Sequence, residues 1–158
     1  MIAYSDNDAL MLVSAQTDNN VYNKLFKDIG LASAPSDRAE AVDYGMTVSE
    51  YCRLFRILYN SGYLTEENSE FALNLLSQST YRGGLLKEMN PPFPVAHKFG
   101  ERVMPGTGSN QLHEVGIFYS DPEPYLLGVM TEGSDLTQLS SVLSEISKLV
   151  YQFYSKKS

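Results

Sequence analysis

Two short polar motifs in the sequence hold residue types that could carry acyl-transfer chemistry. The first is Ser5-Asp6-Asn7, near the start of the chain, and the second is Lys98-Phe99-Gly100, in its later half. A hydroxyl can relay a proton, a carboxamide can donate and accept hydrogen bonds, and an ammonium can hold an anion. A backbone N–H beside such residues can stabilise an oxyanion. A given tripeptide arises often by chance, so the elements that carry these two decide how much they mean.

Each motif also has a purely structural interpretation. Asp6 is a suitable N-cap, because its carboxylate can accept from amides in the first turn of a helix. Lys98 would serve equally well as a solubilising residue on an edge strand. Both interpretations stay open for each motif alone, whereas the presence of both motifs in order favours the chemical one.

Three further residues could be chemical or structural. His97 and His113 are candidate catalytic or metal-binding residues, although a histidine in a strand is more often a half-buried packing residue. If the strand alternates, His97 and Phe99 share one face, while Lys98 points to the other. Cys52 is the single cysteine, so it forms no internal disulfide, and its apolar surroundings favour a small buried core residue.

The segment 1–90 carries the signals of helices, beginning with two near the amino terminus. An apolar run at residues 9–13 follows Asp6 and predicts a short buried helix. A second helix is expected to end at Gly30, where glycine commonly terminates helices. Residues 31–46 show no periodicity and are expected to form a loop.

Two more helices are expected after this loop. Thr47 and Glu50 stand three residues apart, the spacing of a capping box, and open the first of them. Thr65 caps the next, with Phe71 and Leu75 on its expected apolar face. Prolines then stop the helical pattern, at Pro91, Pro92 and Pro94.

The remaining segment is expected to form a small sheet covered by a helix. Strands are predicted over 95–103, 112–119 and 125–130, and the short connections favour an antiparallel meander. Apolar residues between 136 and 153 recur at helical spacing and predict an amphipathic helix across the sheet. Helices followed by strands predict an α+β fold, with a sheet that an upstream segment could complete.

Composition limits the class of protein. With 158 residues, 43% of them hydrophobic, the chain can form a sizeable core, and 1–158 is expected to be one domain, helical over 1–90 and sheet plus helix over 91–158. The net charge of −7 argues against nucleic acid as a partner. No stretch approaches the roughly 20 apolar residues of a spanning helix, and no signal peptide opens the chain, so it is expected to be soluble.

The order and setting of the two motifs resemble those of the class A β-lactamases and related penicillin-binding enzymes. Ser-Asp-Asn and Lys-Thr-Gly are two of the three signatures of these serine hydrolases, and the third is Ser-x-x-Lys. Here the first motif begins a helix, and the second opens a strand that two more strands and a terminal helix follow. The stretches 95–101 and 113–117 also look familiar from bacterial members. The resemblance covers essentially the whole chain.

The resemblance implies roles for the first motif and for the strand. Ser5 would relay a proton to the leaving nitrogen, and Asn7 would hydrogen-bond the substrate amide and a catalytic lysine. Asp6 would be structural. Lys98 would hold a substrate carboxylate and raise the electrostatic potential around Ser5.

Three residues after Lys98 complete the expected substrate-binding set. They are Phe99, Gly100 and Glu101, and the backbone N–H of Glu101 would be one oxyanion donor. The resemblance implies neither a metal nor a cofactor.

The sequence departs from the family pattern in three ways. No serine is followed by a lysine three positions later, so the nucleophile is expected to lie upstream of Met1. Phe99 stands where the family has a hydroxyl residue that helps to bind a carboxylate. The loop at 31–46 lacks the family's Glu-x-x-x-Asn pair, since Glu40 is followed four residues later by Tyr44.

These observations predict part of a serine hydrolase, acylated by β-lactams or cell-wall D-alanyl peptides through an upstream serine. The alternative is a catalytically inactive binding or scaffold domain of the same fold. By resemblance the parent protein would be secreted or in the cell envelope, and could confer antibiotic resistance. An unpaired edge at Tyr125 to Met130 would favour self-association.

Overall fold

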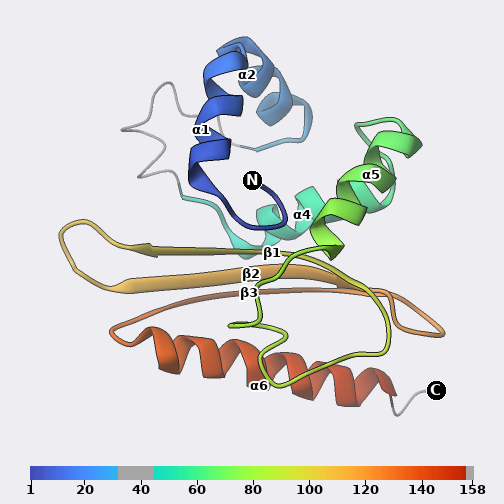
Figure 1. The fold of residues 1–158 in the computed structure, drawn as a ribbon, viewed down its shortest axis with the longest axis vertical. Coiled ribbons are helices and arrows are strands. Elements are labelled where there is room, and N and C mark those ends of the chain that lie inside the picture. The colour runs from blue at the N-terminus through green and yellow to red at the C-terminus, as the bar shows by residue number, and fades with distance from the viewer. Residues whose placement is uncertain (32–44, 156–158) are drawn as a thin grey trace.

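The computed structural model of the chain describes residues 1–31 and 45–155. The sequence predictions for the loop, including Glu40 and Tyr44, fall on residues outside these ranges. In the described part, helices come first, three strands follow, and a long helix ends the fold (Figure 1). The expected α+β fold is therefore confirmed.

The first two helices form an arm that stands above the other helices. Helix α1 is Asn7–Gln16 and α2 is Asn19–Asp28, and Asp6 caps α1 by accepting from the N–H of Ala9 at 2.8 Å. The prediction that α1 is buried is wrong, because neither helix packs closely on another helix or strand of the described residues. The apolar run is exposed instead, with Leu12 72% accessible.

Helices α4 and α5 pack on the sheet. Helix α4 is Val48–Tyr59, opened by the predicted capping box of Thr47, and α5 is Glu66–Ser77, capped by Thr65. The expected apolar face of α5 is partly wrong, since Phe71 is 64% exposed and Leu76 is the buried apolar residue of the helix. Phe55 of α4 and Leu76 meet the same core, so both helices bury one stripe against the strands.

Three strands form an antiparallel meander in the order β1-β2-β3, as predicted. Strand β1 is Val95–Val103, β2 is Asn110–Phe118 and β3 is Tyr125–Gly133, so β2 begins earlier and β3 ends later than expected. In the register between β1 and β2, Phe99 lies opposite Glu114.

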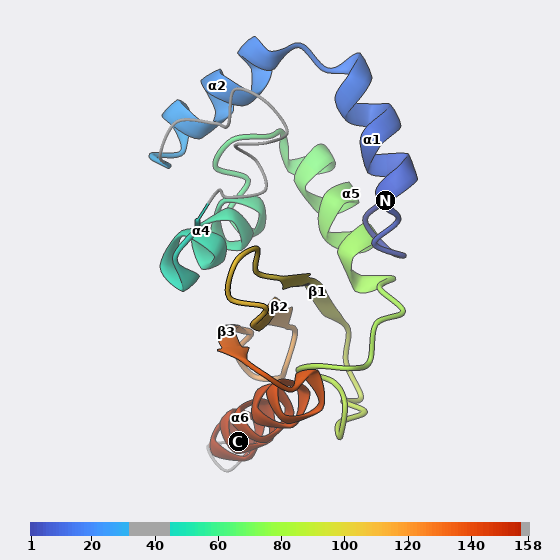
Figure 2. The same cartoon turned by 90° about the vertical axis from the view of Figure 1, so that its left-hand side faces the viewer.

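The sheet has one core on each face. Helix α6, Leu136–Ser155, covers one face, here called the α6 face, while α4 and α5 cover the other, here called the helical face (Figures 1 and 2). Phe118 and Leu143 are fully buried on the α6 face, and Val115 is fully buried on the helical face. Within the described ranges, no helix is long and apolar enough to cross a membrane.

Candidate functional site

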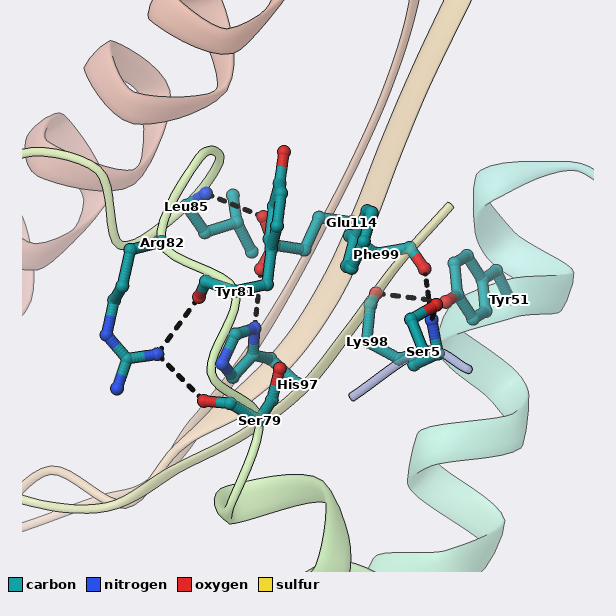
Figure 3. A network of polar contacts seen from close by, with 10 residues as sticks. All are labelled: Ser5, Tyr51, Ser79, Tyr81, Arg82, Leu85, His97, Lys98, Phe99 and Glu114. Atoms are coloured by element: carbon teal, nitrogen blue, oxygen red, sulfur yellow. Dashed lines mark hydrogen bonds and ion pairs between the residues drawn. The ribbon is translucent and has the colours of Figure 1, made fainter. Parts of the chain in front are cut away.

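The two polar motifs meet at a hydrogen bond between Lys98 and Ser5. The Nζ of Lys98 donates to Oγ of Ser5 at 2.6 Å, and to the backbone oxygen of Phe99 at 2.6 Å (Figure 3). Ser5 sits in the turn before α1 with a φ of 51°, in the left-handed region that non-glycine residues seldom adopt. Such a conformation persists only where the surroundings hold it, so the turn gives the hydroxyl a fixed direction.

Lys98 is half-buried, and its surroundings act on its charge in opposite directions. Burial lowers the pKa of its ammonium, and the carboxylate of Glu114 partly offsets this. From α4, the Oη of Tyr51 donates to the backbone oxygen of Lys98 at 3.0 Å. Burial raises the pKa of Tyr51, which keeps this phenol a donor. The lysine is thus held from its backbone and from its side-chain tip.

Phe99 lies between Tyr81 and the Lys98–Ser5 pair. Its ring stacks on Tyr81 with centroids 3.6 Å apart and planes 12° from parallel, and the Nζ of Lys98 is 4.6 Å from its centroid (Figure 3). The second distance is within the range of a cation–π interaction. The position expected to bind substrate therefore presents an aromatic ring to the ammonium.

A buried pair behind the site was missed by the sequence analysis. The Nδ1 of His97 donates to Oε1 of Glu114 at 2.5 Å, and the N–H of Leu85 donates to Oε2 at 2.7 Å. His97 is 1% exposed and Glu114 is fully buried, so the expectation of a half-buried packing histidine is wrong. A Cβ at Gly84 would collide with Oε2 of Glu114, so this position needs glycine.

One sequence signal could have found this pair. Strand alternation places Glu114 on the same face as Leu112 and Phe118, both of which are core positions. A carboxylate at a core position requires hydrogen-bond partners, because an unpaired buried charge is too costly. His97, on the neighbouring strand and the same face, is a suitable partner.

The segment 79–86 carries Tyr81 to its place over Phe99. Besides the bond from Leu85 to Glu114, Arg82 fastens the segment by donating to the backbone oxygens of Ser79 and Tyr81, each at 2.9 Å (Figure 3). Glu114 thus links the sheet to the segment that shapes the site.

All seven residues predicted for the site line one open cavity of about 710 Å³. They are Ser5, Asp6, Asn7, Lys98, Phe99, Gly100 and Glu101. Asn7, Gly100 and Glu101 are exposed, and no atom lies within 4 Å of where a Cβ on Gly100 would be. The strand that carries Gly100 and Glu101, β1, is an edge of the described sheet, so the backbone on its outer side can meet a ligand.

His113 lies apart from this cavity. Its Nδ1 accepts from the N–H of Thr131 at 3.2 Å, and its Nε2 donates to Gln111 at 3.3 Å. Burial lowers its pKa, so it is a neutral, hydrogen-bonded residue of the sheet. Among residues 1–31 and 45–155, no group of three or more histidine, cysteine or carboxylate side chains could hold a metal ion.

Comparison with known proteins gives the family. The model of the beta-lactamase enzyme family matches residues 1–154, which is nearly the whole chain. No curated protein matches it.

Solved structures with the same fold are distant in sequence. A beta-lactamase from Sphaerobacter thermophilus is 16% identical with a TM-score of 0.77, over 96% of this chain and 58% of its own. A class A beta-lactamase representative from Bacteroides cellulosilyticus is 19% identical with a TM-score of 0.75, over 96% of this chain and 60% of its own. PBP-A is 15% identical with a TM-score of 0.68, over 85% of this chain and 50% of its own.

The chain thus spans between half and three fifths of these solved relatives. The family match extends over residues 1–154, from before the Ser-Asp-Asn turn into the terminal helix. The chain belongs to the beta-lactamase enzyme family.

Proposed function

We propose that this chain supplies the proton-relay and substrate-binding part of a serine hydrolase that is acylated through a serine upstream of Met1. The observation that carries the proposal is the 2.6 Å hydrogen bond from Lys98 to Ser5. Because the ammonium donates to Oγ, the hydroxyl proton of Ser5 is left free to be donated elsewhere. A leaving nitrogen in the cavity would be its acceptor.

The other residues of the cavity would serve the same reaction. Asn7, on the first turn of α1, would hold the substrate amide, and the backbone N–H of Glu101 would face a developing oxyanion. Asp6 would hold the turn through its cap on α1. A variant of PBP-A, 14% identical with a TM-score of 0.65, was solved as an acyl-enzyme complex with penicillin G, which supports β-lactams as the ligand class. D-alanyl peptides are proposed beside them from the resemblance of the motifs alone. These ligands would place the parent protein outside the cytoplasm or in the cell envelope.

An inactive binding or scaffold domain is the second candidate. Phe99 favours it, because the ring replaces a hydroxyl that would help to bind a carboxylate and stacks tightly on Tyr81. Such a domain would keep the cavity and bind a ligand without acylation.

Intact mass spectrometry with a fluorescent penicillin separates the two candidates. The protein would be extended upstream to include a Ser-x-x-Lys segment, and Ser5→Ala and Lys98→Met would be compared with the unchanged sequence. A stable adduct that both variants form more slowly would support a peptidase, and rapid turnover would support a β-lactamase. If neither an adduct nor turnover is observed, the result would support the inactive binding or scaffold domain.

Self-association through β3 is a separate proposal. In the described sheet, β3 is an edge strand, and unpaired edges favour pairing with another chain. A monodisperse monomer by light scattering at high concentration would contradict it.

A further inference from the structure

The ammonium of Lys98 has little capacity left for a ligand anion. It has three N–H donors, of which one is used by Ser5 and one by the backbone oxygen of Phe99, both at 2.6 Å. The ring of Phe99 lies beside it, with 4.6 Å between Nζ and the centroid. A carboxylate would therefore meet an ammonium whose contacts are mostly made within the chain.

The ring of Phe99 also shields this ammonium from the direction of Tyr81. Phe99 lies between Tyr81 and Lys98, so a group that approaches from there meets two stacked rings first (Figure 3). Phe99 contributes no hydroxyl to a carboxylate. What it offers instead, where it borders the cavity, is an apolar contact without a hydrogen bond.

The stacked pair is fixed in place and cannot easily turn aside. Tyr81 covers two glycines closely, since a Cβ at Gly83 would come within 3.0 Å of its ring and one at Gly84 within 3.2 Å. The segment that carries it is bonded to Glu114 through Leu85. Burial raises the pKa of Tyr81 to about 12, so the phenol is neutral at physiological pH.

The charges that line the cavity do not favour an anion either. Asp6 and Glu101 are both exposed carboxylates there, against the single side-chain ammonium of Lys98. Negative charges outnumber positive ones among the lining side chains, so the cavity has no cationic excess to attract a carboxylate.

We propose that the part of the cavity lined by Lys98 and Phe99 takes an uncharged ester or amide group of an acyl ligand in place of a free carboxylate. This rests on the proposed function and narrows it: the preferred ligand is an acyl compound whose leaving side is esterified or amidated. Phe99 determines this specificity through its ring, and Tyr81 holds the ring in position.

The test compares two ligands that differ only in this group. Chain 1–158 labelled with ¹⁵N would be titrated with benzylpenicillin and with its methyl ester, and the amides of Gly100 and Glu101 would be followed by NMR. We expect the ester to bind about fivefold more tightly than the acid. Equal affinities, or tighter binding of the acid, would overturn this inference and leave the proposed function intact.

A matched pair of variants assigns the preference to Phe99. Phe99→Thr exposes the ammonium and adds a hydroxyl, so the preference should change to the acid. Phe71→Thr makes the same change at an exposed position on α5 and should leave the preference for the ester as it is. If the Phe99→Thr variant still prefers the ester, the role assigned to the ring is wrong. If neither ligand shifts an amide resonance of the unchanged chain, the proposed function fails, and this inference fails with it.

Discussion

The two faces of the sheet differ in how deeply their ionisable groups are buried and in what those groups contact. On the α6 face, Glu114 is fully buried and both of its oxygens accept hydrogen bonds from within the protein. On the helical face, Lys98 is half-buried and its ammonium reaches a cavity, where it donates to the hydroxyl of Ser5 and to the backbone oxygen of Phe99. His97 and Lys98 are neighbours in sequence, so one strand supplies a fixed structural contact and a group exposed to ligands.

The difference shows which of the two groups is available for chemistry. A group whose partners are all supplied by the fold stabilises one arrangement and has no capacity left for a substrate. A group at the border of a cavity keeps contact with water and ligands. The two faces still influence each other, because the carboxylate of Glu114 on β2 raises the pKa of Lys98 on the neighbouring strand β1.

The largest effect is expected from Glu114→Ala, which breaks the contact on the α6 face. It leaves His97 and the N–H of Leu85 buried without their acceptor, and removing one member of a buried pair costs about 3–5 kcal/mol of unfolding free energy. Urea denaturation would measure the loss.

Glu145→Ala is the matched control for this substitution. Glu145 is an exposed residue of α6, so its removal should change the unfolding free energy by less than about 0.5 kcal/mol. If the two variants lose the same stability, the pair does not hold the α6 face together.

Local signals in the sequence predicted the helices and strands. What these signals missed depends on contacts between helices and strands. The caps at Asp6, Thr47 and Thr65 are hydrogen bonds between residues close in sequence, so the sequence alone was enough to predict them. The exposure of α1 and of Phe71 depends on which surfaces have a neighbour, and apolar composition alone does not show this.

The candidate site divides in the same way. Motif order pointed to seven of the eleven residues that line the cavity, because each motif is contiguous in sequence. The stack of Tyr81 on Phe99 and the pairing of His97 with Glu114 join segments that only the folded chain brings together. Strand alternation separated His97 from Lys98 correctly, yet it gave no partner for the histidine.

A smaller effect is expected on the helical face from Tyr51→Phe. The substitution removes the hydroxyl that donates to the backbone oxygen of Lys98 and keeps the ring, which packs edge-on against Phe55. Loss of one such hydrogen bond should lower the unfolding free energy by about 1 kcal/mol. Tyr59→Phe, at an exposed tyrosine on the same helix outside the cavity, is the control, and equal losses in the two variants would remove Tyr51 from the support of Lys98.

The smallest effect is the pH dependence that the half-buried ammonium gives to folding. Burial lowers the pKa of Lys98 in the folded chain below its ordinary value of 10.5. Between these two values the unfolded chain binds the extra proton, so stability rises with pH in this window as the cost of burying the charge disappears. Lys98→Met has no proton to lose there.

Urea denaturation of the unchanged chain and of Lys98→Met, at about pH 7 and about pH 10, would measure this contribution. The unfolding free energy of the unchanged chain should increase relative to that of the variant as the pH rises, since tyrosines and other lysines titrate alike in both. If the unfolding free energy of the unchanged chain instead fell relative to that of the variant as the pH rose, Ser5 and the carboxylate of Glu114 would stabilise the ammonium of Lys98 more than burial destabilises it. In that case Lys98 would be a fixed structural charge like those of the α6 face, and the contrast between the two faces would not hold.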